Sequence, residues 1–485
     1  MHLNEYIQFD GLGLAALVRR KEVSAAELLQ TALTALERTN PTLNAVIATL
    51  EDEARATLKQ GLPEGPFTGV PFLIKDIILH AANVPTAMGS RVLKELNLKL
   101  PYDSTLMTRY RRAGVVLMGR TNLPELGLLL TTEPQAWGPT RNPWDLERSP
   151  GGSSGGTAAA VRAGVVPLGH GSDGGGSLRV PAAMCGLFGL KPTRGRISAG
   201  PNIGDLLNGF CVEHVLTRSV RDSAAMLDAT AGADFGDPYI IPPPERPFRE
   251  EAAREPGRLR VAFSRKAPSG VPVSPECVAA VEDVARMCAS LGHDVIEAVP
   301  QYSTEALDAA CAVLWTSGFA AWVDSVSAML GHTLGQDSFE ASTWATVQHG
   351  RTVKGSEVQN ALGMLNPISR AVGRFFAEYD VLLTPTLAVP PFRLGYLDGN
   401  APLSYMEFFQ RQAAICPFTV LFNATGQPAM NVPLHWSSGG LPIGVQFAGR
   451  WGDEATLFRL AGQLEQARPW AQRWPRFNAA SPART

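Results

Sequence analysis

The apolar positions near the start of the chain follow a helical spacing. Ser24 and Glu27 form a capping box, in which a serine and a glutamate three residues later satisfy each other's backbone N–H groups. The apolar spacing over 28–36 continues this helix until Asn40 and Pro41, where we expect it to end. The sequence therefore predicts an amphipathic helix at the start of the fold.

Short apolar runs then alternate with helically spaced segments. The segments that predict strands are AVIATL, VPFLI, VVLMG, VVPLG, LRVAF, HDVIEAV, DVLLTP, AMNVPL and IGVQFAG. The segments that predict helices are STLMTRYRRAG, GTAAAVRAG, 275–291 and the long stretches near 304–330 and 355–379. This alternation is typical of an α/β fold.

One proline-rich and charge-rich segment, about 234–256, is expected to be an excursion on the surface. Because strands recur on both sides of it, the sequence predicts a single large domain over 1–485. Within that domain we expect a core block over about 60–230 and a variable helical insertion over about 258–380.

Composition narrows the class of protein. Of the 485 residues, 45% are hydrophobic and 18% are charged, which fits a globular chain with a large core and argues against disorder. The formal net charge of −2 gives no electrostatic reason to expect nucleic acid or a membrane as a partner. The N-terminus carries Glu5 and Asp10 and lacks a basic signal-peptide region, so we expect a cytoplasmic protein. No apolar run approaches the roughly 18 residues that span a bilayer.

The cysteines show no pattern of metal binding or disulfide pairing. They stand at positions 185, 211, 277, 288, 311 and 416, without a C-x-x-C pair and without histidines at zinc spacing. We therefore expect buried free thiols, no metal and no cofactor.

The stretch GHGSDGGGS, 169–177, raises the possibility of a phosphate-binding loop. It follows an apolar run, 163–168, that is typical of a strand, and it matches G-x-G-x-x-G. A dinucleotide site also needs an acidic residue about 20 positions later, and after Asp173 the next acidic residue is Asp205. Pro181 also breaks the chain where a helix should be running. A dinucleotide site is therefore not favoured.

Three other stretches carry reactive residues: GVPFLIKD at 69–76, SPGGSSGGTA at 149–158 and SDGGGSLRVPA at 172–182. Three glycines precede Ser177, so their backbone N–H groups can converge on one negative oxygen, as an acyl-transfer intermediate requires. A serine nucleophile also needs a base. That base could be one of the eight histidines, or Lys75 made neutral by burial after the apolar VPFLI.

In this order, these three stretches resemble the signature blocks of the amidase signature family of serine hydrolases. The segments AGVVLMGRTNLPELG, TRSVRDSAAMLDATAG, DVLLTPT and LPIGVQFAGRWGDEATLFRLAGQLEQA extend the resemblance over most of the chain, and 258–415 is its least diagnostic part. SDGGGS followed by CGLFGLKPTRGR and EHVLTRSVRDSA is similar to the branch that contains 6-aminohexanoate cyclic-dimer hydrolases. The resemblance implies one large α/β domain with a central mixed, twisted β-sheet covered by helices on both faces.

The resemblance also implies an amidase that cleaves a carbon–nitrogen bond through an acyl-enzyme. The implied nucleophile is Ser177, the implied base is Lys75, and the relay between them is Ser153, with a cis peptide bond to Gly152. The implied oxyanion hole consists of the backbone N–H groups of Gly174, Gly175 and Gly176. The residues implied to support this loop are Ser172, Asp173 and Arg179. The expected partner is a small-molecule amide, and the expected state is a monomer or homodimer.

Three alternatives are weighed against this interpretation. GGSSG also matches G-x-S-x-G, so an α/β-hydrolase esterase could use Ser153, but that pattern needs a preceding strand and NPWDLERSP reads as a loop. An amidotransferase A-type subunit acting on glutamyl-tRNA usually carries a phrase like SLDQ, whereas this chain has GDLLNGFCVEHVLTRSV. A binding protein without activity would be expected to have lost Lys75, Ser153 or Ser177.

The inserted region carries three tryptophans, Trp315, Trp322 and Trp344, within helical patterns. We expect each to lie in the core and not in a pocket. If one or two of them line the cleft, an apolar or aromatic acyl group or a cyclic amide would fit. We therefore expect a carboxylic amide of moderate size as the substrate.

Overall fold

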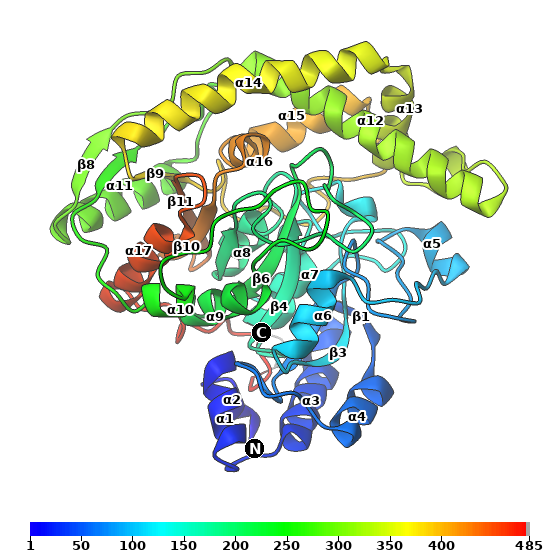
Figure 1. Cartoon of the computed structure of the whole chain (residues 1–485), viewed down its shortest axis with the longest axis vertical. Helices are drawn as coiled ribbons and strands as arrows, with labels where there is room; N and C mark the ends of the chain where they lie inside the picture. The colour runs from blue at the N-terminus through cyan, green and yellow to red at the C-terminus, as the bar shows by residue number, and fades with distance from the viewer. Residues whose placement is uncertain (482–485) are drawn as a thin grey trace.

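An eleven-stranded mixed β-sheet runs through the protein, whose computed structural model describes residues 1–481 (Figure 1). The strand order is β1-β3-β2-β4-β6-β5-β10-β11-β9-β7-β8. The strands are β1 Val46–Thr49, β2 Pro71–Lys75, β3 Val116–Thr121, β4 Leu168–Asp173, β5 Phe188–Lys191, β6 Val212–Thr217, β7 Arg260–Phe263, β8 Asp294–Glu297, β9 Val381–Pro385, β10 Ala429–Trp436 and β11 Pro442–Gly449. β2 pairs in parallel with β3 and β4, and β7 pairs in parallel with β8 and β9, whereas the other pairs are antiparallel. The predicted α/β class is confirmed.

Helices cover the sheet on both faces (Figure 1). They are α1 Leu3–Tyr6, α2 Gly11–Arg19, α3 Ala25–Leu43, α4 Glu51–Gln60, α5 Arg91–Leu96, α6 Thr105–Arg112, α7 Gly155–Arg162, α8 Arg179–Cys185, α9 Val220–Thr230, α10 Phe248–Glu251, α11 Pro275–Ser290, α12 Thr304–Leu330, α13 Ala341–Thr352, α14 Gly355–Glu378, α15 Tyr405–Ile415, α16 Val420–Thr425 and α17 Glu454–Ala467, with 3₁₀ turns η1 Glu125–Gly127 and η2 Gln336–Ser338. Neighbouring residues of β10 point to opposite faces of the sheet. Met430 and Val432 share a core with α11 and α17 on one face. Asn431 points to the other face, where it lies beside Gly444 of β11, and a Cβ at Gly444 would contact Ala183 of α8. The central strands are therefore buried on both sides.

The first predicted helix forms with its capping box but ends later than expected. Ser24 Oγ accepts the Glu27 N–H at 3.2 Å, and a Glu27 carboxylate oxygen accepts the Ser24 N–H at 2.8 Å. Pro41 lies in the last turn of α3, where it removes only one hydrogen-bond donor. The helix ends when Asn44 adopts a left-handed conformation, with φ of 50°.

The strand expected over 163–168 lies instead in β4, within the glycine-containing stretch itself. A Cβ at Gly169 would approach Thr157 of α7 to 2.7 Å, and one at Gly171 would approach Leu178 to 2.7 Å. Glycine therefore serves close packing of helices on this strand, not phosphate binding. The expected break at Pro181 is also wrong, because α8 runs through it. Pro181 is the third residue of α8, where its missing N–H needs no partner within the helix.

Two central strands, β5 and β6, were not among the predicted segments. β5 has only four residues, and β6 carries Glu213 and His214 at buried positions, which hides its apolar pattern. The Glu213 carboxylate contacts His170, and His214 contacts Ser223 at 2.9 Å. Buried polar groups with partners can therefore occupy a strand that hydrophobicity alone does not reveal.

The region expected as a helical insertion, about 258–380, contributes β7 and β8 to the sheet as well as long helices. α12, α13 and α14 form the layer coloured yellow to yellow-green at the top of Figure 1. By length and composition α12 could cross a membrane, which corrects the expectation that no run approaches that length. It packs against α13 and α14 and is partly buried, as core helices of folded proteins are.

The close crossing of α12 and α13 gives a stability prediction. A Cβ at Gly350 would lie 2.0 Å from the Thr316 carbonyl oxygen, which is backbone and cannot move cheaply. Gly350→Ala is therefore expected to lower the free energy of unfolding by about 2 kcal/mol. Gly363 lies on the exposed side of α14 with open space around it. Gly363→Ala is expected to raise the free energy of unfolding by about 0.5 to 1 kcal/mol. Urea denaturation of both variants measures the difference, and equal effects would contradict the close approach.

Candidate active site

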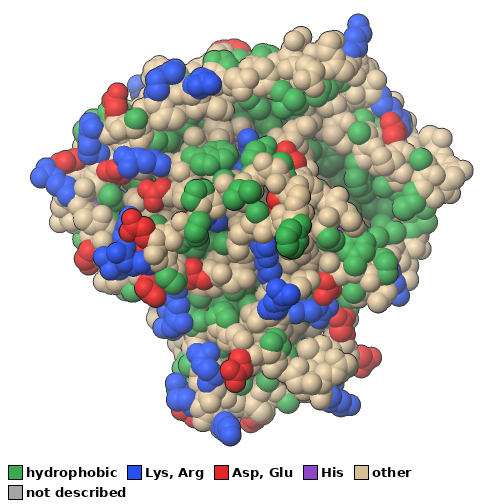
Figure 2. Space-filling model, in the orientation of Figure 1, with side chains coloured by type: hydrophobic (Ala, Val, Ile, Leu, Met, Phe, Trp, Pro, Cys, Tyr) green, Lys and Arg blue, Asp and Glu red, His purple; other side chains and the backbone are tan. Residues whose placement is uncertain are grey.

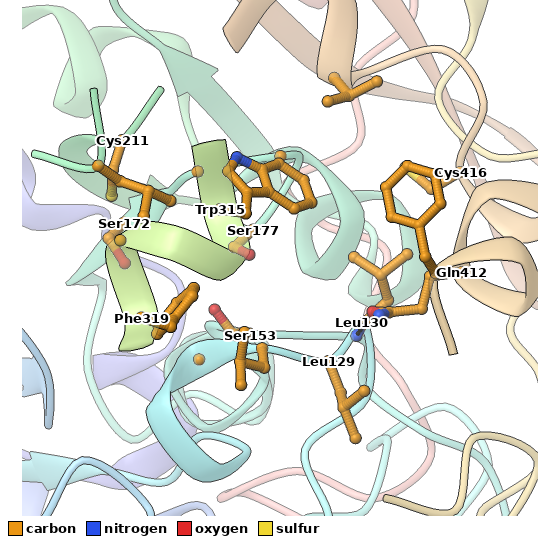
Figure 3. A pocket seen from close by; sticks show the side chains of 18 of the residues that line it. Leu129, Leu130, Ser153, Ser172, Ser177, Cys211, Trp315, Phe319, Gln412 and Cys416 are labelled. Carbon is orange, nitrogen blue, oxygen red and sulfur yellow. Dashed lines mark hydrogen bonds between the residues drawn. The ribbon is translucent and has the colours of Figure 1, made fainter. Parts of the chain in front are cut away.

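The reactive residues come together at one edge of the sheet. Lys75 ends β2 and Ser172 lies near the end of β4, and these two strands are parallel neighbours, so their carboxyl ends meet. Ser153 lies in the loop before α7, and Ser177 lies just before α8. Both serine side chains reach the same cavity and face one another across it (Figure 3). The structure thus brings together the residues that the sequence singled out.

Lys75 is fully buried beneath this cavity. Its Nζ lies 2.7 Å from Ser153 Oγ and 2.9 Å from Ser172 Oγ. Burial lowers the pKa of Lys75 to about 7, although Cys211, if ionised, and the Asp173 and Glu213 carboxylates oppose this shift. The amine is therefore substantially uncharged near neutral pH and hydrogen-bonded to two hydroxyls.

The backbone around these residues is fixed by contacts that require glycine. The peptide bond between Gly152 and Ser153 is cis. A Cβ at Gly152 would lie 2.4 Å from the Thr131 carbonyl oxygen. In the loop before Ser177, Gly176 has φ of +144°, and a Cβ there would lie 2.7 Å from Thr419 Oγ1. Larger residues are therefore excluded at both positions by close neighbours.

The glycine loop leaves its donors free. Thr419 Oγ1 donates to the Gly175 carbonyl, which anchors the loop from outside. Within residues 1–481, no hydrogen bond joins the N–H groups of Gly174, Gly175 or Gly176 to a protein acceptor. These groups lie beside Ser177, so they can donate to a bound oxygen.

A buried ion pair holds the loop in place. Arg179 Nε and Nη2 each donate to an Asp173 carboxylate oxygen at 2.9 Å, and both side chains are fully buried. The Asp173 carboxylate also accepts from the Leu178 N–H and the Asn423 amide. Although burial opposes it, the Arg179 charge lowers the pKa of Asp173 to about 2. Because Asp173 and Arg179 flank the loop, this pair fixes the loop at both ends.

A second buried pair supports Lys75, and sequence reasoning did not find it. His170 Nδ1 accepts the Lys75 backbone N–H at 3.3 Å, and His170 Nε2 lies 3.1 Å from a Glu213 oxygen. Burial lowers the pKa of His170. His170 falls within the quoted glycine stretch, but its partner Glu213 lies on β6, which no apolar pattern revealed.

The cavity has a volume of about 510 Å³, which is typical of small-molecule sites. Apolar side chains make up most of its wall, and Cys211 and Gln412, also missed by sequence reasoning, contribute to it (Figure 3). Trp315 and Trp322 line the cavity, so the expectation that they lie only in the core is wrong for both. Trp344 does not line it and packs beside other apolar residues. Two of the three tryptophans are therefore available to contact a ligand.

The segment before Ser153 does not have the structure that an α/β-hydrolase esterase would need there. Residues 141–153 form turns and isolated bridges, with no strand leading into the serine. The partner of Ser153 Oγ is the Lys75 amine. The geometry that G-x-S-x-G requires is therefore missing from this part of the described chain.

Comparison with known proteins gives similarity over nearly the whole chain. The family model described as Amidase matches residues 27–458. The 6-aminohexanoate-cyclic-dimer hydrolase of Paenarthrobacter ureafaciens is 38% identical over 486 residues, covering 96% of each chain. A solved structure of 6-aminohexanoate cyclic dimer hydrolase complexed with substrate is similar with a TM-score of 0.91 and 36% identity, covering 98% of this chain and 100% of the other. A bacterial aryl acylamidase of the Amidase signature family is similar with a TM-score of 0.86 and 27% identity, covering 96% and 97%.

The buried ion pair under the loop predicts a pH-dependent stability difference. Asp173→Asn leaves Arg179 buried without its counter-charge, so we expect it to lower the free energy of unfolding by about 3 kcal/mol near pH 7. A lowered carboxyl pKa contributes stability above the ordinary value of 3.8, and this contribution is lost as pH falls toward about 2. The difference between wild type and variant should therefore shrink on acidification below about pH 4.

Urea denaturation over a series of pH values measures this difference. Asp294 forms a pair with Arg258 in which both side chains are exposed, so Asp294→Asn is the matched control and should leave stability nearly unchanged. A constant difference between Asp173→Asn and wild type over the whole pH range would contradict the assignment.

Proposed function

This chain belongs to the amidase signature family of hydrolases, and we propose that it cleaves the carbon–nitrogen bond of a small carboxylic amide through an acyl-enzyme on Ser177. The observation that carries the proposal is the buried Lys75 amine, which lies 2.7 Å from Ser153 Oγ and whose pKa burial lowers to about 7. An amine in this state can accept a proton that a charged lysine could not.

The proposed first step is attack of Ser177 Oγ on the amide carbonyl carbon. The Ser177 proton passes to Ser153 Oγ as the proton of Ser153 passes to Lys75 Nζ. The same path then returns a proton to the amide nitrogen, and the carbon–nitrogen bond breaks with release of a neutral amine. An amine anion is a very poor leaving group, so this proton is essential.

The second step is hydrolysis of the ester formed on Ser177. Water loses its proton along the same path as it attacks the ester carbonyl, and Ser177 regains its proton when the acid leaves. Both steps place negative charge on the carbonyl oxygen. The free N–H groups of Gly174, Gly175 and Gly176 are the proposed donors to that oxygen, and one such donor typically contributes about 3 kcal/mol.

Ser172 acts in this scheme as a positioning residue. Its Oγ lies 2.9 Å from Lys75 Nζ, on β4 next to the strand that carries the lysine. The second contact holds the amine at a fixed distance from Ser153. Asp173 and Arg179 position the loop in the same sense, without contact to the reacting atoms.

The apolar cavity supports an amide of moderate size as the substrate. One relative is named for a cyclic dimer of 6-aminohexanoate and another is named an aryl acylamidase, so both linear and cyclic amides lie within the proposal. The esterase alternative has no strand before Ser153, and no observation favours an amidotransferase subunit. The cytoplasmic location and the monomer or homodimer state stay predictions.

The first test is covalent labelling by a fluorophosphonate probe. The wild type should be labelled, and Ser177→Ala should lose labelling together with at least about 10⁴-fold of its amide hydrolysis. Ser269→Ala is the matched control, because Ser269 also lines the cavity, and this variant should be labelled normally. Labelling of Ser153 in the Ser177→Ala protein would favour the esterase mechanism.

The second test is the pH dependence of kcat/KM for a neutral amide. Only uncharged Lys75 accepts a proton, so activity should rise as pH rises through about 7 and then level off. Lys75→Ala should remove amide cleavage and retain part of the cleavage of a matched ester, whose leaving group needs no proton. Equal loss on both substrates would contradict the role of Lys75 in protonating the amine.

A further inference from the structure

The cavity extends along one face of α12. The α12 residues that line it are Thr304, Leu307, Asp308, Trp315, Gly318, Phe319 and Trp322. From Thr304 to Trp322 the helix advances by about 27 Å at 1.5 Å per residue. Apolar side chains gather in a hollow beneath α12 in the space-filling view (Figure 2). The site is therefore an elongated groove rather than a round pocket.

The reacting serines lie near the middle of this groove. A Cβ at Gly175 would approach the Trp315 ring to 2.8 Å, which places that ring against the loop that ends in Ser177. Phe319, one turn further along α12, lies on the same wall (Figure 3). The groove therefore continues on both sides of the reacting serines, toward Trp322 on one side and toward Thr304 on the other.

The arm toward Thr304 contains one charged group. Among the described residues that line the cavity, Asp308 is the one carboxylate, and no lysine or arginine lines it. Asp308 is partly buried. Burial and then the neighbouring Glu305 carboxylate raise the pKa of Asp308, and no bond to a cation within residues 1–481 offsets this. A carboxylate that is partly desolvated and unpaired is stabilised when a cation binds it.

The surroundings of Asp308 suit an organic cation. Tyr302 lines the same arm, and its pKa is raised by burial and then by the Asp308 charge, so the two side chains are close enough to act on one another. Leu307 and Pro268 also line the cavity and add apolar surface to it. An aromatic ring next to a carboxylate binds ammonium groups by combined charge and cation–π attraction.

We propose that Asp308 binds a protonated amine at the far end of the substrate, so that the enzyme prefers amides that carry a cationic group on an apolar spacer. This inference rests on the proposed amidase function. Along the axis of α12, Asp308 lies seven residues from Trp315, or about 10 Å. The spacer therefore has about the reach of three extended amino acid residues. Among the described residues, no lysine or arginine lines the groove to receive an anionic end, and burial lowers the pKa of His80, which also lines it, to about 4.

The test uses matched p-nitroanilides that differ only at the end of the acyl chain. A series of ω-aminoalkanoyl p-nitroanilides of increasing length is compared with alkanoyl p-nitroanilides and with p-nitroanilide half-amides of dicarboxylic acids. N-(ω-aminoalkyl) alkanamides and N-alkyl alkanamides place the same amine on the leaving-group side. The wild type should show the highest kcat/KM for a cationic member of either set, with an optimum spacer length, and the lowest for the anionic members.

Three variants separate the Asp308 contact from other effects. Asp308→Asn should lose roughly tenfold of the preference for cationic over neutral amide, as about 1.4 kcal/mol of lost ion pairing gives. Asp308→Lys should reverse the preference toward the anionic member. Glu305→Gln removes the same charge one turn away, outside the cavity lining, and should leave the preference unchanged.

The outcomes distinguish failure of the Asp308 assignment from failure of the proposed amidase function. If the wild type cleaves neutral amides with no preference for cationic ones, the assignment of Asp308 is overturned while the amidase function stands. If Glu305→Gln loses the preference as fully as Asp308→Asn does, a general field and not a contact is responsible, which also overturns the assignment. If no amide is cleaved at all, the proposed function itself fails.

Discussion

The arrangement depends on the removal of water from one primary amine. Lys75 would carry a charge at neutral pH in solvent, and burial at the end of β2 lowers its pKa to about 7. The Asp173 and Glu213 carboxylates oppose this shift, and each has a partner of its own: Asp173 forms an ion pair with Arg179, and Glu213 contacts the His170 ring. The partners of the acids around Lys75 therefore matter as much as the apolar shell, because an unpaired carboxylate would restore the charge on the lysine.

The second constraint is the close approach of the glycine backbone to neighbouring atoms. Gly152 and Gly176 occupy positions where a Cβ would collide with neighbours, and Thr419 anchors the loop from a distant part of the chain. A surface that stabilises negative oxygen must be rigid before the reaction begins, since reorganisation would cost part of its benefit. The buried network around Asp173 supplies that rigidity through bonds to residues as distant in sequence as Asn423 and Gln446.

The sequence predicts most strands and the reactive residues of the site. It does not predict β6 or the position of Trp315, and each has a physical reason. The runs before Lys75 and in the late sheet predict their strands, because their apolar residues are buried as the pattern implies. The hydrophobic pattern does not predict β6, because Glu213 is a buried polar residue and only the structure shows its partner. Trp315 lies in a helix that is apolar nearly all round, and no periodicity distinguishes a side chain facing a groove from one facing the core.

The placement of α12 has a consequence for how such enzymes diverge. The groups proposed to transfer protons and form the acyl-enzyme come from β2 and the loops before α7 and α8, whereas α12 forms one long wall and belongs to the least diagnostic part of the sequence. Reactivity and selectivity are thus encoded in separable stretches of the gene. Exchange of a few side chains on a single helix could redirect the catalyst to a new compound while leaving its chemical machinery intact.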